Sequence, residues 1–113
     1  MRPELLYIIR VSPESRQAAI EVLSELMTFA AFDVPLRVLF LDQAAKMLVP
    51  GIDPEISGMV SALGLYGVSD LFVETESLEV MDVALSGLSL RVDRLPRGEI
   101  PGFIHSHQRV FGD

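Results

Sequence analysis

The sequence predicts an α/β fold in which a mostly parallel, five-stranded sheet lies between two layers of helices. Apolar runs of strand length alternate with segments of helical periodicity along the chain, as in three-layer α/β/α proteins. Two of these runs, residues 5–11 and 36–41, are almost continuously apolar, which is typical of strands buried on both faces of a parallel sheet. Parallel strands need crossover connections, and the intervening helices supply them.

Two helices have clear start signals. Residues 12–14 (Ser-Pro-Glu) supply an N-cap, a proline at the first helical position and an acid in the first turn, so a helix is expected from there to about Ala31. The same pattern recurs at residues 53–55 (Asp-Pro-Glu) and predicts a helix through Leu63, ended by two glycines.

The other elements follow in order along the chain. Asp42 is expected to cap a short helix over residues 43–48. The remaining expected elements are a strand at 71–73, a helix at 77–85, an alternating strand at 88–95 with one exposed face, a helical or irregular segment at 100–106 and a short final strand at 108–111.

Composition limits the classes of function. At 113 residues we expect one domain, residues 1–113. No apolar run approaches the ~20 residues of a membrane span, and the N-terminus lacks the layout of a signal peptide, so a cytoplasmic location is expected. The sequence contains no cysteine, which excludes disulfides, thiolate metal sites, cysteine nucleophiles and persulfide carriage by this chain.

The net charge of −7 argues against a nucleic-acid surface, which would need a basic stripe. From residue 47 to residue 90 there is no Lys or Arg, and the seven acids of that stretch equal the whole net charge. This stretch is either a solvated face or a patch that steers a basic partner. Arg91, Arg94 and Arg97 are candidates to meet it from a neighbouring subunit.

Loops at the carboxyl ends of parallel strands commonly bind ligands. Here those loops offer Ser12, Asp42, Glu74 and Asp93. Ser12 is most simply an N-cap. Asp42 and Glu74 could form a carboxylate pair for acid–base chemistry or a hard cation, although a cap and a solvated loop acid are the simpler interpretations. His105 and His107 supply only two ligands, so we predict no metal site and no cofactor.

Apolar residues near the predicted loops and the chain end suggest either ordinary core or a protein interface. They are Leu65, Tyr66, Phe72, Phe103, Ile104 and Phe111. With the two carboxylates of Asp42 and Glu74, Tyr66 completes the set of candidate binding residues.

Three stretches resemble the DsrE/DsrF-like sulfur-relay family, in its TusC/DsrF branch. They are Val-Leu-Phe-Leu-Asp at 38–42, Leu-Val-Pro-Gly at 48–51 and above all Leu-Gly-Leu-Tyr-Gly at 63–67, followed by Ser-Leu at 77–78. The resemblance covers essentially the whole chain. It implies a five-stranded parallel sheet with strand order 4-3-2-1-5 and assembly from related small subunits.

In the sulfur-carrying subunit of that family, the active cysteine lies in the loop after the third strand, and Glu74 is the matching position here. The resemblance therefore implies a non-catalytic subunit of a heteromeric complex of the TusBCD or DsrEFH type, supporting persulfide transfer toward tRNA 2-thiouridine or in sulfur oxidation. We do not expect the chain to be an enzyme by itself. The alternative is a self-associating α/β protein that binds a ligand or metal at the strand ends; an acid–base enzyme ranks last.

Overall fold

The computed structural model describes residues 5–88 and 90–112. The strands are β1 (Leu5–Ile9), β2 (Leu36–Phe40), β3 (Leu71–Glu74), β4 (Asp93–Leu95) and β5 (Arg109–Gly112). The α-helices are α1 (Arg16–Ala31), α2 (Pro54–Ala62), α3 (Thr75–Met81) and α4 (Ile100–His105). Short 3₁₀ helices are η1 (Asp42–Leu48), η2 (Leu63–Tyr66), η3 (Leu85–Gly87) and η4 (Arg97–Glu99).

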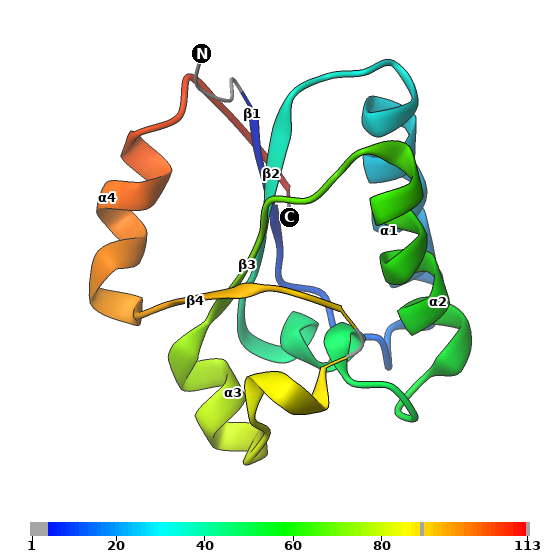
Figure 1. The fold of residues 1–113 in the computed structure, drawn as a ribbon, viewed down its shortest axis with the longest axis vertical. Coiled ribbons are helices and arrows are strands. Elements are labelled where there is room, and N and C mark those ends of the chain that lie inside the picture. Colours follow the sequence, from blue (N-terminus) through cyan, green and yellow to red (C-terminus); the bar gives the residue numbers. More distant parts are fainter. Residues whose placement is uncertain (1–4, 89, 113) are drawn as a thin grey trace.

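All five strands are parallel and lie in the order β4-β3-β2-β1-β5. Helices α1 and α2 lie side by side on one face of the sheet, α4 covers the other, and α3 lies at the carboxyl end of β3 (Figure 1). The predicted three-layer α/β/α fold and the strand order implied by the resemblance are both confirmed. No helix among the described residues has the length and apolar composition needed to cross a bilayer.

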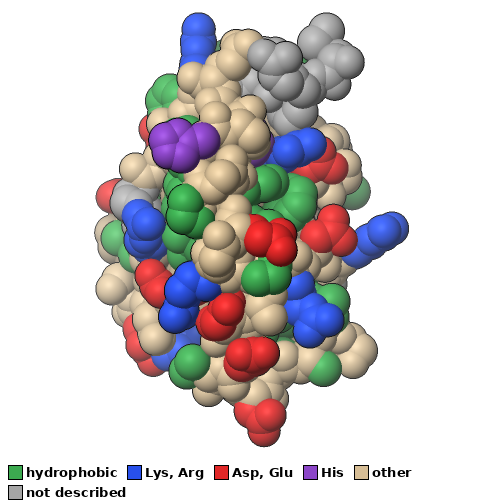
Figure 2. All heavy atoms as spheres, turned by 90° about the vertical axis from the view of Figure 1, so that its left-hand side faces the viewer, with side chains coloured by type: hydrophobic (Ala, Val, Ile, Leu, Met, Phe, Trp, Pro, Cys, Tyr) green, Lys and Arg blue, Asp and Glu red, His purple; other side chains and the backbone are tan. Residues whose placement is uncertain are grey.

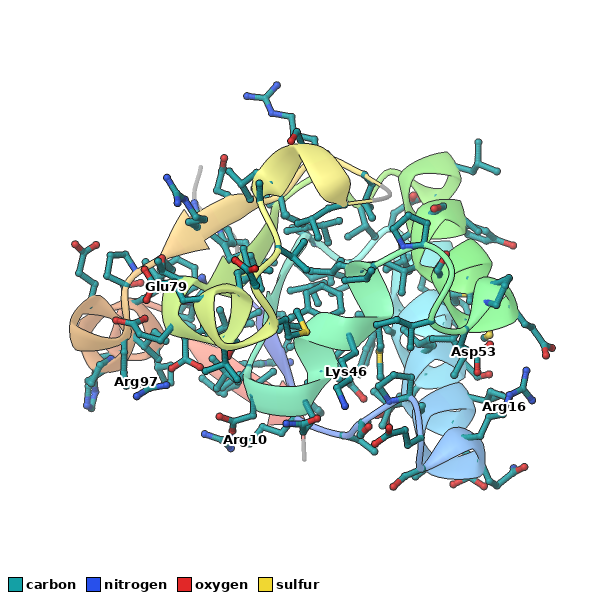
Figure 3. All side chains as sticks on the ribbon, turned by 90° about the horizontal axis from the view of Figure 1, so that it is seen from below. Arg10, Arg16, Lys46, Asp53, Glu79 and Arg97 are labelled. Atoms are coloured by element: carbon teal, nitrogen blue, oxygen red, sulfur yellow. The ribbon has the colours of Figure 1, made fainter. Side chains whose placement is uncertain are left out.

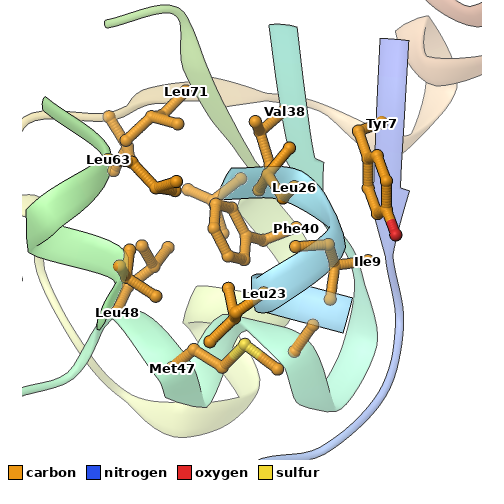
Figure 4. Packing of buried hydrophobic residues seen from close by; sticks show 14 of the residues in the cluster. Tyr7, Ile9, Leu23, Leu26, Val38, Phe40, Met47, Leu48, Leu63 and Leu71 are labelled. Atoms are coloured by element: carbon orange, nitrogen blue, oxygen red, sulfur yellow. The ribbon is translucent and has the colours of Figure 1, made fainter. Parts of the chain in front are cut away.

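The central strands are buried on both faces, as their continuous apolar runs predicted. In β1, Tyr7 and Ile9 point into the larger core beneath α1 and α2, while Leu6 and Ile8 point into a smaller core beneath α4. Figure 4 shows the larger core, where Phe40 and Leu26 pack in the space between strands and helices without exposed surface. Burying such side chains contributes roughly 1.5–3 kcal/mol each, so the sheet is held chiefly from the α1 and α2 side.

The first helix begins later than predicted. Residues 12–15 form a turn, in which the N–H of Ser15 donates to the carbonyl oxygen of Ser12 at 3.0 Å, and α1 starts at Arg16. The Ser12 hydroxyl accepts from the N–H of Glu14 at 3.1 Å. Ser12 therefore stabilises this turn and is not the N-cap of the helix, because the hydroxyl is already used by a nearer backbone donor.

Asp42 is not a cap either. Its backbone is left-handed, with φ of 54°, and it is the first residue of η1 without a capping hydrogen bond from its side chain. Asp33 and Asp82 have similar φ values of 58° and 55°. Aspartate tolerates this region better than most residues, and Asp82 ends α3 there, which is why this helix stops short of the predicted residue 85.

The predicted strand at 88–95 is too long, because only Asp93–Leu95 pairs with β3. Leu88 and Leu90 instead pack against the larger core as partly buried side chains. Ser89 lies outside the described residues. The alternating apolar residues of this segment therefore pack against the larger core, and their backbone does not pair with β3.

The final strand is present as predicted, shifted by one residue. Gly112 ends it with φ of 132°, and a Cβ atom there would lie 2.0 Å from the carbonyl oxygen of Ile8. Only glycine allows the strand to approach β1 this closely. Nearby, Phe111 packs edge-on against Phe29 of α1 at 5.3 Å between ring centroids.

Candidate functional site

The candidate site lies where β2, β3 and β4 end. Because β3 lies between the other two strands, Glu74 at its end is flanked by Asp42 after β2 and by Arg97 after β4. Helix α3 starts immediately after Glu74, and Ser77 lies in its first turn. This is the edge of the sheet at which open α/β proteins usually bind ligands.

Glu74 is a buried carboxylate whose two oxygens are both used. The residue is 5% exposed. Its Oε1 accepts from the Ser77 hydroxyl at 2.5 Å, and its Oε2 accepts from Nε of Arg97 at 2.7 Å. The Arg97 guanidinium, helped by the Ser77 hydroxyl, lowers the pKa of Glu74, while burial acts in the opposite direction. The simpler interpretation from sequence, a solvated loop acid, was wrong.

Arg97 connects the segment after β4 to the start of α3. Its backbone N–H donates to Oε1 of Glu76 at 2.9 Å while its side chain holds Glu74. Viewed from this end of the sheet, Arg97 lies beside α3, on the same side as Glu79 (Figure 3). We expected Arg97 to meet the acidic stretch of a neighbouring subunit; in the structure it instead contacts Glu74 and Glu76 of that stretch within its own chain.

Ser77 joins the two sequence-predicted carboxylates without bringing them into a pair. Its hydroxyl donates to Glu74 and accepts from the backbone N–H of Asp42 at 3.0 Å. The carboxylate of Asp42 is 61% exposed and lies 3.9 Å from Nε of Arg10. Each carboxylate therefore has its own cation. Sequence reasoning missed Ser77, although a serine three residues after the acid that begins a helix was a usable signal.

A small pocket of about 110 Å³ opens beside this network. It is lined by Asp42, Gln43, Ser77, Val80, Met81 and Arg97. Its volume is well below the roughly 300–1,000 Å³ of typical ligand sites. Glu74, with both oxygens bonded and its pKa lowered, is poorly suited to act as a general base near neutral pH.

The histidines do not form a ligand pair. His105 is exposed at the end of α4, whereas His107 is buried and its Nδ1 lies 2.8 Å from the carbonyl oxygen of Phe103. The His107 ring also packs edge-on against the Phe103 ring at 4.9 Å between centroids. Within residues 5–88 and 90–112, no group of three or more His, Asp or Glu side chains is placed to hold a metal ion.

Tyr66 lies at the opposite end of the sheet from Asp42 and Glu74. It belongs to η2, near the start of β2, and is 48% exposed beside Leu65, which is 88% exposed. The structure therefore brings together two of the three candidate binding residues and separates the third.

The apolar candidates divide between core and surface. Phe72 and Phe103 pack together beneath α4 with 4.8 Å between ring centroids, and the Arg37 guanidinium lies 5.8 Å from each ring. Leu65, Tyr66 and Phe111 remain exposed. On the α4 side of the molecule, acidic and basic side chains are interspersed, with hydrophobic side chains visible between them (Figure 2).

Comparison with known proteins identifies relatives both in sequence and in structure. No family model matches the chain. The "Protein TusC homolog" of Pseudomonas aeruginosa is 34% identical over 116 residues, covering 97% of this chain and 98% of that protein. The YchN protein of E. coli superposes with a TM-score of 0.83 at 14% identity, covering 99% of this chain and all of that one. MTH1491 of Methanobacterium thermoautotrophicum, titled a protein of unknown function, gives a TM-score of 0.73 at 20% identity over 99% of this chain and all of that one.

Proposed function

Because this chain belongs to the TusC/DsrF branch of the DsrE/DsrF-like sulfur-relay family, we propose that it is a non-catalytic subunit of a heteromeric sulfur-relay complex. The complex is of the TusBCD or DsrEFH type and acts in the cytoplasm. This chain holds related, cysteine-bearing subunits while they pass persulfide sulfur, toward tRNA 2-thiouridine or in sulfur oxidation.

One observation carries the proposal: the chain has no cysteine, and Glu74 stands at the position that the resemblance matches to the family's sulfur-carrying cysteine. Sulfane sulfur is accepted by a thiolate, and the chain has no cysteine anywhere in its 113 residues. Glu74 does not supply a substitute chemistry, because both its oxygens are bonded within the chain, to Ser77 and Arg97. The strand end at which the resemblance places the family's cysteine serves here to fix α3 to the segment after β4.

The surface supports a role in protein contacts rather than direct contact with RNA. The interspersed charges on the α4 side, with the net charge of −7, do not provide the basic stripe that phosphate backbones require. Exposed apolar side chains outside η2, among them Ile52 and Val110, provide area of the kind found at subunit interfaces.

Co-expression with two related small subunits, one of them carrying the cysteine, tests the proposal. A tagged copy of this chain is expected to recover both relatives in fixed stoichiometry, and sulfur transfer by the complex is expected to fall when this chain is omitted. Recovery of this chain alone, with sulfur transfer by the other two unaffected by its omission, would contradict the proposal.

A second candidate function, ligand binding at the strand ends, is favoured by the 110 Å³ pocket and by the 62% exposed side chain of Arg97 at its wall. Nε of Arg97 is bound to Glu74, and the rest of the guanidinium is available to a small anion. Inorganic phosphate and sulfite, added separately, should raise the melting temperature of the wild type but not of Arg97→Gln if this function is correct. Equal melting temperatures with and without the anions would exclude it.

A further inference from the structure

The opposite end of the sheet carries a different surface. In the parallel sheet, β3 lies between β4 and β2. The segment that leads into β3 therefore lies between the segments that lead into β4 and β2. Helix η2 leads into that central segment. On one side of it lies residue 91, before β4, and on the other lies residue 33, before β2. We call this surface the amino-end patch; it comprises Phe32, Asp33, Leu65, Tyr66 and Arg91.

The centre of the amino-end patch is apolar and exposed. Leu65 is 88% exposed and Tyr66 is 48% exposed, although both follow the fully buried Leu63. Gly67 turns the chain back into the fold with φ of 87°, a conformation that favours glycine. Such exposure costs solvation free energy that the isolated chain does not recover, which is the usual mark of an interaction site.

A hollow flanks the centre on each side. On the β4 side it measures about 430 Å³, and Gly64, Val68, Leu90 and Val92 are among its lining residues. On the β2 side it measures about 170 Å³, with Tyr66 and Asp33 in its wall. Next to Asp33 stands Phe32, whose side chain is 77% exposed. One flank therefore has the larger hollow and the other an exposed aromatic side chain.

The flanks also differ in charge. Arg91 lines the β4-side hollow and has no ion pair within the described part of the chain, whereas Asp70 beside it lies 3.7 Å from Arg37. Asp93, also in this hollow, is the register partner of Phe72 and so faces the α4 side of the sheet. Asp33, on the other flank, likewise has no ion pair among residues 5–88 and 90–112.

We propose that the amino-end patch is a docking surface for a second copy of this chain, related by a two-fold axis that passes close to Leu65. Such an axis exchanges the two flanks. Arg91 then meets Asp33 of the second copy, and Phe32 enters the 430 Å³ hollow of the second copy, each contact occurring twice. Self-complementarity across a two-fold axis is the requirement for an isologous dimer. This contact is independent of the proposed role in sulfur relay.

Equilibrium sedimentation of the purified full chain tests the contact. The wild type should associate reversibly into dimers. Leu65→Asp should raise the dimer dissociation constant about a hundredfold or more, because a buried leucine is lost from both copies. Val80→Asp is the matched control: Val80 is 81% exposed at the other end of the sheet, and its substitution should leave the constant unchanged. A monomeric wild type, or equal effects of the two substitutions, would overturn the proposal.

Thiol cross-linking tests the symmetry. Because the chain has no cysteine, Leu65→Cys introduces the only thiol. A short thiol-specific cross-linker should join two copies of Leu65→Cys, since a residue near a two-fold axis lies near its own equivalent, and should leave Val80→Cys monomeric. Cross-linking of Leu65→Cys only to a different, co-expressed subunit would assign the surface to that subunit and overturn the proposal.

A charge exchange tests the assignment of the flanks. Arg91→Asp and Asp33→Arg should each weaken dimerisation about tenfold, which corresponds to about 1.4 kcal/mol. The double variant should restore it, because each new pair again joins opposite charges. Both positions are exposed, but Asp33 has a left-handed backbone that arginine adopts less readily than aspartate, so circular dichroism and the melting temperature should be used to confirm that each variant is folded. A double variant no tighter than the single ones would contradict the pairing.

Discussion

The two ends of the sheet differ in how their charged groups are paired. At the carboxyl end, several acids have a basic partner within the chain: Glu74 pairs with Arg97, Asp42 with Arg10, and Asp53 and Glu55 with Arg16. Figure 3 shows this end, with Arg97 on one side and Arg16 beside Asp53 on the other. At the amino end, Leu65 is almost fully exposed and Asp33 and Arg91 lack ion pairs within the described residues.

In this chain, the two ends of the sheet have different roles. The end that hosts chemistry in open α/β proteins is here occupied by interactions that stabilise the chain itself. The end that usually serves stability carries the exposed Leu65 and Tyr66 of η2, together with Asp33 and Arg91, which have no ion pair among the described residues. A protein that works by binding other chains needs the second feature and has no use for a free nucleophile at the first.

The largest change in stability is expected in η2, where a buried and an exposed leucine can be compared directly. Leu63 is fully buried and Leu65 is 88% exposed, two residues apart. Leu63→Ala should lower the free energy of unfolding by about 2–5 kcal/mol, because it removes buried methyl groups and leaves a cavity. Leu65→Ala should change it by less than about 0.5 kcal/mol. Urea unfolding of dilute, monomeric protein measures both; equal losses would mean that Leu65 packs within the fold.

A smaller effect is expected at the carboxyl end. Glu74→Ala should cost roughly 1–3 kcal/mol, since it removes the acceptor of two hydrogen bonds from Ser77 and Arg97. The matched control is Glu79→Ala, on the exposed surface of α3, which should be close to neutral. Urea unfolding again gives the comparison. A Glu74→Ala protein as stable as the Glu79→Ala protein would show that the network contributes nothing to the fold.

The stabilisation by Glu74 should depend on pH. Its pKa in the folded chain lies below the ordinary value of 4.5, chiefly because of Arg97, so the ionised form is favoured by folding. The contribution of Glu74 to stability is fully present when the pH is above its ordinary pKa. It is lost as the pH falls through the lower pKa that Glu74 has in the folded chain. The stability difference between wild type and Glu74→Gln, which cannot ionise, should therefore shrink as the pH is lowered from about 7 to about 3. A constant difference over this range would contradict the ion pair.

The smallest change in stability is expected from substitution of Arg16, which lies at the carboxyl end of the sheet, on its outer side. Its guanidinium lowers the pKa of Asp53 by a hydrogen bond at 3.0 Å, but the Arg16 side chain is 49% exposed, so salt should screen the interaction. Arg16→Gln should lower the melting temperature slightly in dilute buffer and not measurably in concentrated salt. A large fall in melting temperature that does not depend on salt would contradict a screened surface ion pair and would mean that Arg16 has a structural role.

The sequence determined much of the fold because the signals for it are local. The continuous apolar runs of β1 and β2 and the proline-marked start of α2 required no knowledge of distant residues. The ends of helices were less predictable, because Asp82 ends α3 through a left-handed conformation that its neighbours do not announce. Residues 88–92 were wrongly predicted as part of a strand. Alternating apolar and polar residues occur both in a paired strand and in an unpaired segment that packs against the core, as here.

The candidate site could be predicted in position but not in character. Its place after β3 followed from the fold. That Glu74 is buried and neutralised depends on Arg97, 23 residues later in the sequence, and on the register that sets β4 against β3. A carboxylate at a strand end has the same sequence signature whether it is solvated, catalytic or paired. Its role depends on a neighbouring residue such as Arg97, which only the tertiary structure brings close.

We propose that this chain supports sulfur transfer without carrying sulfur itself. Intact mass spectrometry of the assembled complex, after incubation with a persulfide donor, is the decisive test because each subunit is weighed separately. We expect added sulfur on a cysteine-bearing relative and none on this chain. Sulfur bound to this chain, and lost from it when an acceptor is supplied, would contradict the claim.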